Sequence, residues 1–256
     1  MSVDNRVSGR LALITGASGG IGAACARALW AEGASLALTY FSHQESIGAL
    51  AKELTASPDD NRRITTHKVD TSSVEALEHL FQEINEQHSQ RAPDILISNA
   101  GYGKRLPGIM DVTYDEFDYT LDVNLKASFV LSKLSIPHME ARRWGRIVFI
   151  SSIAAIGGGI NACHYAASKA GLSGMMKNLA RKHAKMGITV NDVAPAMIGD
   201  TGMIPDAQFV EGTPGDVKNI PVGRLGTPEE CANVVMMICK TGYLTGQSIL
   251  LSGGLG

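Results

Sequence analysis

Residues 11–22 read LALITGASGGIG, an apolar run that passes directly into a turn with four glycines, and a helix pattern begins near residue 20. Glycine tolerates positive φ and lets a ligand approach the backbone, so such a turn can bring amide groups and a helix N-terminus to a phosphate. The spacing GxxxGxG differs from the dinucleotide-binding pattern GxGxxG, and a tight structural turn is the alternative for this segment taken alone. The residues of the expected phosphate-binding turn are Gly16, Ser18, Gly20, Ile21 and Gly22.

Short apolar runs alternate with longer amphipathic segments along the rest of the chain. This alternation predicts repeated β-α-β units around a parallel sheet that is covered on both faces. The expected strands are residues 11–14, 35–40, 64–69, 94–98, 146–151, 188–194 and 248–251. The expected helices are near residues 20–32, 43–56, 72–88, 113–139, 162–186 and 228–240. The fold class is therefore α/β, a doubly wound Rossmann-type domain with a parallel seven-stranded sheet and helices on both faces.

The domain organisation follows from the absence of linker sequences. No proline-rich or charged stretch interrupts the alternation, so residues 1–256 are expected to form a single domain. Residues 199–226 have no clear period and are rich in glycine and proline. A long irregular segment inside a compact domain is commonly functional or disordered, and we interpret this one as a substrate lid.

The charge balance argues against a nucleic-acid partner. The chain has 23 Lys and Arg against 25 Asp and Glu, a net charge of −2, with no basic tail or stripe. No segment reaches the ~18 uninterrupted apolar residues of a membrane span, and the N-terminus lacks the apolar core of a signal peptide. The four cysteines are far apart and form no CxxC pair, so we interpret them as reduced core thiols. These features predict a cytoplasmic protein with no membrane partner.

The end of the second expected strand bears on the choice of nucleotide. In this fold an acidic residue there binds the ribose diol of NAD(H) and repels the phosphate of NADP(H). Residues 39–43 read TYFSH and hold no acid, so they favour NADP(H), with Ser42 as a candidate phosphate ligand; ordinary polar loop residues are the alternative. Asp70 ends the third strand and either accepts from adenine or caps the next helix. Asn99 follows the fourth strand, at the same edge of the sheet.

Tyr165 and Lys169 are four residues apart in an expected helix, so their side chains project from one face. A free phenol has a pKa near 10 and is a poor base at neutral pH, but a nearby ammonium favours the phenolate. With six tyrosines in the chain, a pair at this spacing also arises by chance. Ser152 at the end of the fifth strand and Asn124 in the preceding helix strengthen the case, because strand ends and helix starts meet at one crevice in this topology.

Together, TGASGGIG at 15–22, NAG at 99–101, Asn124, Ser152 and YAASK at 165–169 resemble the short-chain dehydrogenase/reductase family. The resemblance covers nearly the whole chain, and the segments 223–230 and 244–247 are similar to the branch that contains 3-oxoacyl-carrier-protein reductases. It implies that Ser152 holds a substrate carbonyl, Tyr165 gives the proton, Lys169 binds ribose hydroxyls and lowers the Tyr165 pKa, and Asn124 orders a relay water. Tyr165 and Lys169 thus belong to both the catalytic and the cofactor-binding sets. No metal is implied.

The chain departs from the family pattern at several places, and two of them bear on cofactor binding. Gly19 stands where NADP-dependent relatives commonly have Arg, which removes one expected phosphate ligand. The segment after the sixth strand is one residue longer than usual before its Thr, so the resemblance assigns the nicotinamide amide to Ile198 and a phosphate to Thr201. The family also implies a homo-oligomer, a tetramer or a dimer.

Three functional hypotheses remain open for the sequence. The first is an NADPH-dependent carbonyl reductase that converts a ketone to a secondary alcohol, with 3-oxoacyl thioesters among the candidate small-molecule substrates. The second is an NAD-dependent dehydrogenase of alcohols, steroids or polyketides, because the same residues serve both directions. The third is a non-catalytic regulator that binds NADP(H); the intact set of Asn124, Ser152, Tyr165 and Lys169 argues against it.

Overall fold

The computed structural model describes residues 4–55, 62–89, 91–157 and 159–256. Within these residues the strands form one parallel sheet of seven, in the order β3-β2-β1-β4-β5-β6-β7. The strands are β1 Leu11–Ile14, β2 Ser35–Tyr40, β3 Ile64–Lys68, β4 Ile95–Ser98, β5 Gly145–Ile150, β6 Ile188–Pro195 and β7 Ser248–Leu251. The predicted fold class is confirmed, and the order reverses between β1 and β4, where this class of fold binds its ligands.

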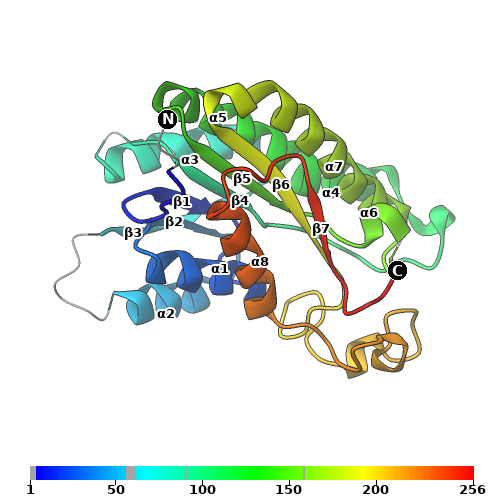
Figure 1. The fold of residues 1–256 in the computed structure, drawn as a ribbon. Helices are drawn as coiled ribbons and strands as arrows, with labels where there is room; N and C mark the ends of the chain where they lie inside the picture. Colours follow the sequence, from blue (N-terminus) through cyan, green and yellow to red (C-terminus); the bar gives the residue numbers. More distant parts are fainter. Residues whose placement is uncertain (1–3, 56–61, 90, 158) are drawn as a thin grey trace.

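Helices cover both faces of the sheet (Figure 1). Those of one face are α1 Gly20–Ala31, α2 Gln44–Leu54 and α8 Pro228–Cys239. Those of the other are α3 Val74–Gln87, α4 Tyr114–Leu121, α5 Ala127–Arg142 and α7 Cys163–His183, with a short α6 at Ala154–Gly157 that the sequence did not predict. Successive strand residues point to opposite faces, so Ala12 and Ile14 enter the core beneath α1 and α8, whereas Leu11 and Leu13 enter the core beneath α3 and α5.

The expected helix over 113–139 is interrupted. Thr113 caps α4 by accepting from the Glu116 N–H, and α4 passes into a π-helical turn at Asp122–Lys126 before α5 begins. Such turns insert one residue into a helix and are frequent at functional sites. The turn carries Asn124, which is 1% exposed.

Residues 199–226 are irregular, as predicted, apart from 3-10 turns at Gln208–Val210 and Val217–Asn219. The two ends of this segment are joined: the Gly199 N–H donates to the Gly226 carbonyl (3.0 Å), and the Gly226 N–H donates to the Met197 carbonyl (3.0 Å). A small separate core that includes Ile204, Val210 and Ile220 fills its interior. The segment is therefore a packed loop closed at its base.

Two further expectations concern the cysteines and the membrane. Cys25, Cys231 and Cys239 are buried free thiols, but Cys163 is exposed, so the expectation of four core thiols was wrong for the residue that begins α7. In the described part of the chain, no helix combines the length and the apolarity that crossing a bilayer requires.

Candidate active site

The glycine turn between β1 and α1 depends on glycine at two positions. Gly16 has φ +64°, and its N–H donates to the Thr39 hydroxyl of the neighbouring strand (3.2 Å). A Cβ atom on Gly22 would lie 2.4 Å from the Gly16 carbonyl oxygen, so only glycine lets the helix pack this closely on the turn. Gly19 is the N-cap of α1 and supplies no side-chain cap, and the first turn holds no acid. The amide groups and the positive end of the helix dipole are thus available to an anion.

Asn99 supports this turn from the neighbouring strand end. Its side-chain amide donates to the carbonyls of Thr15 (2.9 Å) and Gly16 (3.2 Å). In return, the Thr15 hydroxyl accepts from the N–H groups of Asn99 (3.0 Å) and Ala100 (2.9 Å). The side-chain amide of Asn99 therefore holds the glycine turn in place. A contact between Asn99 and a cofactor stays a prediction. The sequence analysis did not identify Thr15 as a residue that stabilises the turn. The available signal was a hydroxyl side chain at the end of a strand, directly before a glycine.

The start of the 199–226 segment lies over the same turn. A Cβ on Gly20 would meet the Asp200 carbonyl oxygen at 2.4 Å and the Thr201 methyl at 3.2 Å. The Thr201 hydroxyl donates to the Ile198 carbonyl (3.1 Å) and accepts from the Ile204 N–H (3.1 Å), while Ile198 itself is buried. The structure thus brings Thr201 to the glycine turn, and Ile198 is joined to it through the Thr201 hydroxyl; the roles of both residues toward a cofactor stay predictions.

Ser42 and Asp70 lie at the ends of neighbouring strands. Ser42 is exposed after β2, with its hydroxyl 3.1 Å from Nδ1 of His43. Asp70 accepts from the N–H (2.9 Å) and the hydroxyl (2.7 Å) of Ser72, so it shapes the turn before α3, and Ser73 is the actual cap of that helix. Within the described residues, neither the Ser42 nor the Asp70 side chain forms a hydrogen bond or ion pair with the glycine turn.

Tyr165 lies near the N-terminus of α7 and is 6% exposed. Burial raises the pKa of its phenol, and a hydrogen bond with Ser152 opposes that increase. Burial disfavours the phenolate because a charge is poorly solvated away from water. The phenol is therefore protonated at neutral pH, and it has a hydroxyl at the end of β5 as its partner. The structure brings Tyr165 and Ser152 together as expected.

Lys169 lies one turn further along α7 and is buried. Its ammonium donates to the Ile150 carbonyl (2.8 Å) and lies 5.7 Å from the centre of the Tyr165 ring. The resemblance implies that Lys169 lowers the Tyr165 pKa, whereas burial, the largest influence on this phenol, raises it; the role of Lys169 in setting that pKa stays a prediction. Burial also lowers the pKa of Lys169 itself to about 8, against the charge of Asp192.

This lowered pKa predicts a pH dependence of stability. The folded-state pKa lies below the ordinary value of 10.5, so between pH 8 and 10.5 the unfolded chain binds more protons. The contribution of Lys169 to stability therefore rises with pH in that window. From pH 7.5 to 9.5, the free energy of unfolding of the parent should gain on the order of 2 kcal/mol relative to Lys169→Met. Urea denaturation at both pH values measures this gain, and a difference that stays constant with pH would contradict it.

Asn124 is fixed by three hydrogen bonds. Its amide group donates to the Tyr102 carbonyl (2.8 Å) and the Ser168 hydroxyl (2.9 Å), and its Oδ1 accepts from the Tyr102 N–H (2.7 Å). Ser168 in turn donates to the Tyr165 carbonyl (2.8 Å). A Cβ on Gly101 would lie 3.4 Å from the Lys169 ammonium and 3.5 Å from Asn124 Oδ1. Asn124 thus joins the loop after β4 to α7 beside both catalytic candidates.

Met203, which the sequence did not single out, also belongs to this site. The Tyr165 hydroxyl donates weakly to the Met203 sulfur (3.9 Å). The methyl carbon of Met203 would lie 3.6 Å from a Cβ on Gly101. A carbonyl oxygen that receives a proton from Tyr165 must come within hydrogen-bond reach of the same hydroxyl. Met203 therefore occupies the approach to Tyr165, a placement that no local pattern in the glycine-rich and proline-rich segment could indicate.

Known proteins resemble this chain over nearly its full length. Residues 16–256 match the model of a family described as Enoyl-(Acyl carrier protein) reductase. The 3-oxoacyl-[acyl-carrier-protein] reductase FabG of Rickettsia bellii is 38% identical over 97% of this chain and 98% of the relative. The FabG protein of Aquifex aeolicus is 34% identical over 98% of each chain. A solved short-chain dehydrogenase/reductase of Serratia marcescens has a TM-score of 0.85 and 33% identity, covering 97% of this chain and 98% of its own.

Proposed function

Because this chain belongs to the short-chain dehydrogenase/reductase family, we propose that it is an NADPH-dependent carbonyl reductase that converts 3-oxoacyl thioesters to 3-hydroxyacyl thioesters. The observation that carries the proposal is the convergence of Ser152, Tyr165, Lys169 and Asn124 at one sheet edge, next to an uncapped helix N-terminus in a glycine turn. The names of the relatives supply the substrate class, since they are 3-oxoacyl-[acyl-carrier-protein] reductases.

The side chains divide the reaction between them. Ser152 orients the substrate carbonyl, and Tyr165, whose raised pKa keeps it protonated, gives its proton to the carbonyl oxygen. When bound, the nicotinamide supplies the hydride to the carbonyl carbon. Lys169 binds the ribose hydroxyls through its ammonium, and Asn124 holds the loop after β4 and a relay water. Ser18, Gly20, Ile21 and Gly22 would hold the pyrophosphate through their backbone amides, and Gly16 would give the turn its shape. The rest of the dinucleotide would be held by Ser42, Asp70, Asn99, Ile198 and Thr201.

The cofactor preference rests on residues 39–43. This segment holds no acid, and Ser42 and His43 are exposed where a 2′-phosphate would lie. Fluorescence titration with NADPH and with NADH tests the preference, with tighter binding of NADPH expected and tighter binding of NADH contradicting it. The NAD-dependent dehydrogenase and the non-catalytic regulator remain the alternatives. Oxidation of NADPH with a panel of 3-oxoacyl thioesters, quinones and steroids separates them, because a regulator binds the cofactor without oxidising it.

We also propose that residues 199–226 act as a lid within a single domain, and that Met203 sets how readily a carbonyl reaches Tyr165. Met203→Ala removes the side chain that lies 3.9 Å from the Tyr165 hydroxyl. The KM for a small 3-oxoacyl thioester should fall about three- to tenfold, which corresponds to about 1 kcal/mol less competition for the site. Steady-state kinetics at saturating NADPH measure the change. An unchanged or raised KM in Met203→Ala would contradict a blocking role.

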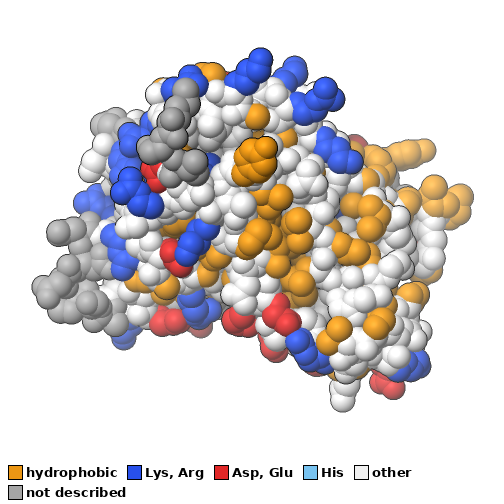
Figure 2. Space-filling model, viewed as in Figure 1, with side chains coloured by type: hydrophobic (Ala, Val, Ile, Leu, Met, Phe, Trp, Pro, Cys, Tyr) orange, Lys and Arg blue, Asp and Glu red, His pale blue; other side chains and the backbone are white. Residues whose placement is uncertain are grey.

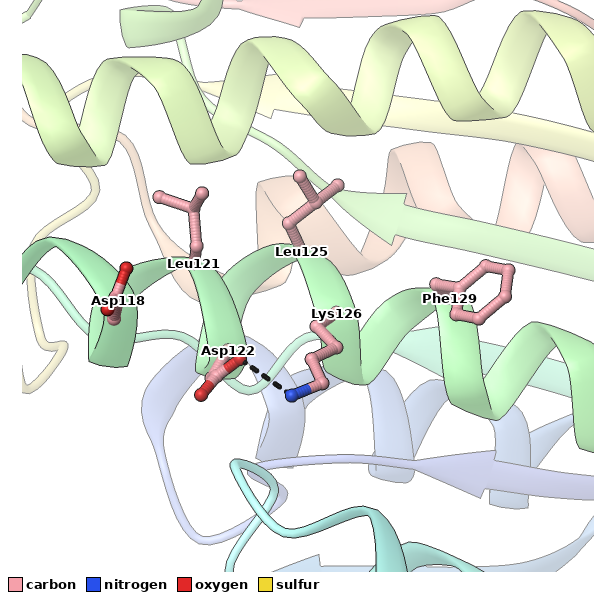
Figure 3. A pocket seen from close by; sticks show the side chains of 6 residues that line it. All are labelled: Asp118, Leu121, Asp122, Leu125, Lys126 and Phe129. Carbon is pink, nitrogen blue, oxygen red and sulfur yellow. Dashed lines mark hydrogen bonds and ion pairs between the residues drawn. The ribbon is translucent and has the colours of Figure 1, made fainter.

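We infer that the chain forms a homo-oligomer, a dimer or a tetramer, through two apolar faces. Hydrophobic side chains gather over α8 and β7 (Figure 2), where Met237, Tyr243 and Leu250 are exposed. Along the helix from α4 to α5, Phe129 is 53% exposed, while the partly buried Leu121 and Leu125 point toward α7 and an Asp122–Lys126 ion pair lies on the other side (Figure 3). Exposed apolar patches of this kind commonly mark interfaces. Light scattering should give the mass of two or four chains, and a monomer at micromolar concentration would contradict the inference.

A further inference from the structure

The carboxylate of Glu116, on α4, interacts with side chains from two other segments of the chain. The Lys104 ammonium lies 3.2 Å from its Oε2. Burial raises the pKa of the Tyr102 phenol, and its interaction with the same carboxylate raises that pKa further. From α7, Nε2 of His164 approaches its Oε1 to 3.9 Å. The carboxylate therefore connects α4, the loop after β4 and the start of α7.

His164 directly precedes Tyr165 and is fully buried. Among the described residues, neither of its ring nitrogens has a hydrogen-bond partner, and neither does Oε1 of Glu116. Polar atoms buried without partners are costly, typically by about 1–3 kcal/mol each. Nε2 of His164 and Oε1 of Glu116 lie 3.9 Å apart, so these two buried atoms without hydrogen bonds are neighbours.

The loop segment that Glu116 holds lies against the catalytic tyrosine. Asn124 binds the backbone of Tyr102 on both its N–H and its carbonyl, and Glu116 binds the side chains of Tyr102 and Lys104. Gly103 lies in the sequence between Tyr102, which Asn124 binds, and Lys104, which Glu116 binds. A Cβ built on Gly103 would lie 3.1 Å from Cε2 and 3.2 Å from Cδ2 of Tyr165, so the backbone of this segment packs on the tyrosine ring.

We propose that Glu116 is a positioning residue: with His164 as its buried partner, it holds residues 102–104 on the ring of Tyr165 and so fixes the direction of the Tyr165 hydroxyl. The inference rests on the proposed function, because it assigns Glu116 to the geometry of proton donation. Proton transfer requires a hydrogen bond of about 2.6–3.2 Å, so a displaced ring lowers the rate of the chemical step. Within the described residues, no hydrogen bond or ion pair joins Glu116 to the glycine turn, so its removal should leave cofactor binding intact.

The test compares Glu116→Ala and Glu116→Gln with Asp115→Ala, an exposed neighbour on the same helix. In Glu116→Ala, kcat for a 3-oxoacyl thioester should fall about tenfold, while the NADPH Kd stays within twofold of the parent. Glu116→Gln should restore most of the kcat, because its amide oxygen still accepts from Tyr102. A merely structural role would not produce this split between kcat and cofactor binding, nor rescue by the amide. A kcat within twofold of the parent in Glu116→Ala would overturn the proposal.

Hydrogen exchange keeps the inference separate from the proposed function. The Tyr102 N–H, which donates to Asn124, should exchange at least tenfold faster in Glu116→Ala, with exchange in β4 and β5 unchanged. This measurement needs no substrate. If the parent protein reduces no 3-oxoacyl thioester, the proposed function fails and exchange at residues 102–104 still decides the role of Glu116. Unchanged exchange in that peptide would overturn the positioning role even in an active enzyme.

Discussion

Tyr165→Phe is expected to lower kcat for carbonyl reduction by about 100- to 10,000-fold, the range that general acid catalysis contributes. The phenol is buried and protonated, and its partners are Ser152 and the sulfur of Met203. Phenylalanine keeps the ring on which Gly103 packs and removes only the hydroxyl. The loss should therefore appear in kcat, with the NADPH Kd changed less than threefold.

The matched control is Tyr114→Phe, which removes a hydroxyl from a tyrosine that is 91% exposed at the start of α4. Initial rates of NADPH oxidation at saturating substrate compare the two variants with the parent. Tyr114→Phe should match the parent. Turnover by Tyr165→Phe within tenfold of the parent would show that another group donates the proton.

The second large effect is expected at Gly22→Ala. The new methyl group would lie 2.4 Å from the Gly16 carbonyl oxygen, 2.8 Å from the Asn99 side-chain nitrogen and 2.9 Å from the Ala17 Cα, and two of these three contacts involve backbone. Helix α1 must then move away from the glycine turn. The NADPH Kd should rise about 100-fold or more, and overpacking should lower the free energy of unfolding by about 1–3 kcal/mol.

Gly19→Ala is the control from the same turn. Its φ is −96°, and its new methyl group would meet only the Gly16 carbonyl oxygen, at 3.7 Å. Titration calorimetry with NADPH and urea denaturation measure both variants. Gly19→Ala should change the NADPH Kd less than tenfold. Equal losses in the two variants would mean that the position of the added methyl, and hence the close packing at Gly22, does not determine binding.

The sheet was predictable because its signals are local. The expected strands at 11–14, 35–40 and 248–251 have the observed bounds, since each apolar run is short and flanked by turn residues. The π-helical turn at Asp122–Lys126 was not predicted, because its extra residue is held by tertiary contacts such as those of Asn124 with Tyr102. A helical period over 113–139 contains no sign of it.

Some contacts of the candidate site were also predictable from the sequence, and others were not. The association of Ser152 with Tyr165 follows from strand and helix ends meeting at one edge of the sheet. Met203 and Glu116 could not be found by that reasoning, because their contacts with Tyr165 and His164 join segments far apart in the sequence. The raised pKa of Tyr165 could not be predicted either, since the four-residue spacing to Lys169 does not reveal how deeply the phenol is buried. Burial and the exact direction of a side chain require the assembled fold.

The central claim is that a hydride passes from NADPH to a carbonyl carbon while Tyr165 protonates the oxygen. The most direct measurement uses NADPH deuterated at the transferred position of the nicotinamide, with a 3-oxoacyl thioester as substrate and mass spectrometry of the product. The account predicts a 3-hydroxyacyl thioester with one deuterium on carbon 3, formed by the parent and nearly absent with Tyr165→Phe. A product without deuterium, or no product from any 3-oxoacyl thioester while NADPH binds, would contradict it.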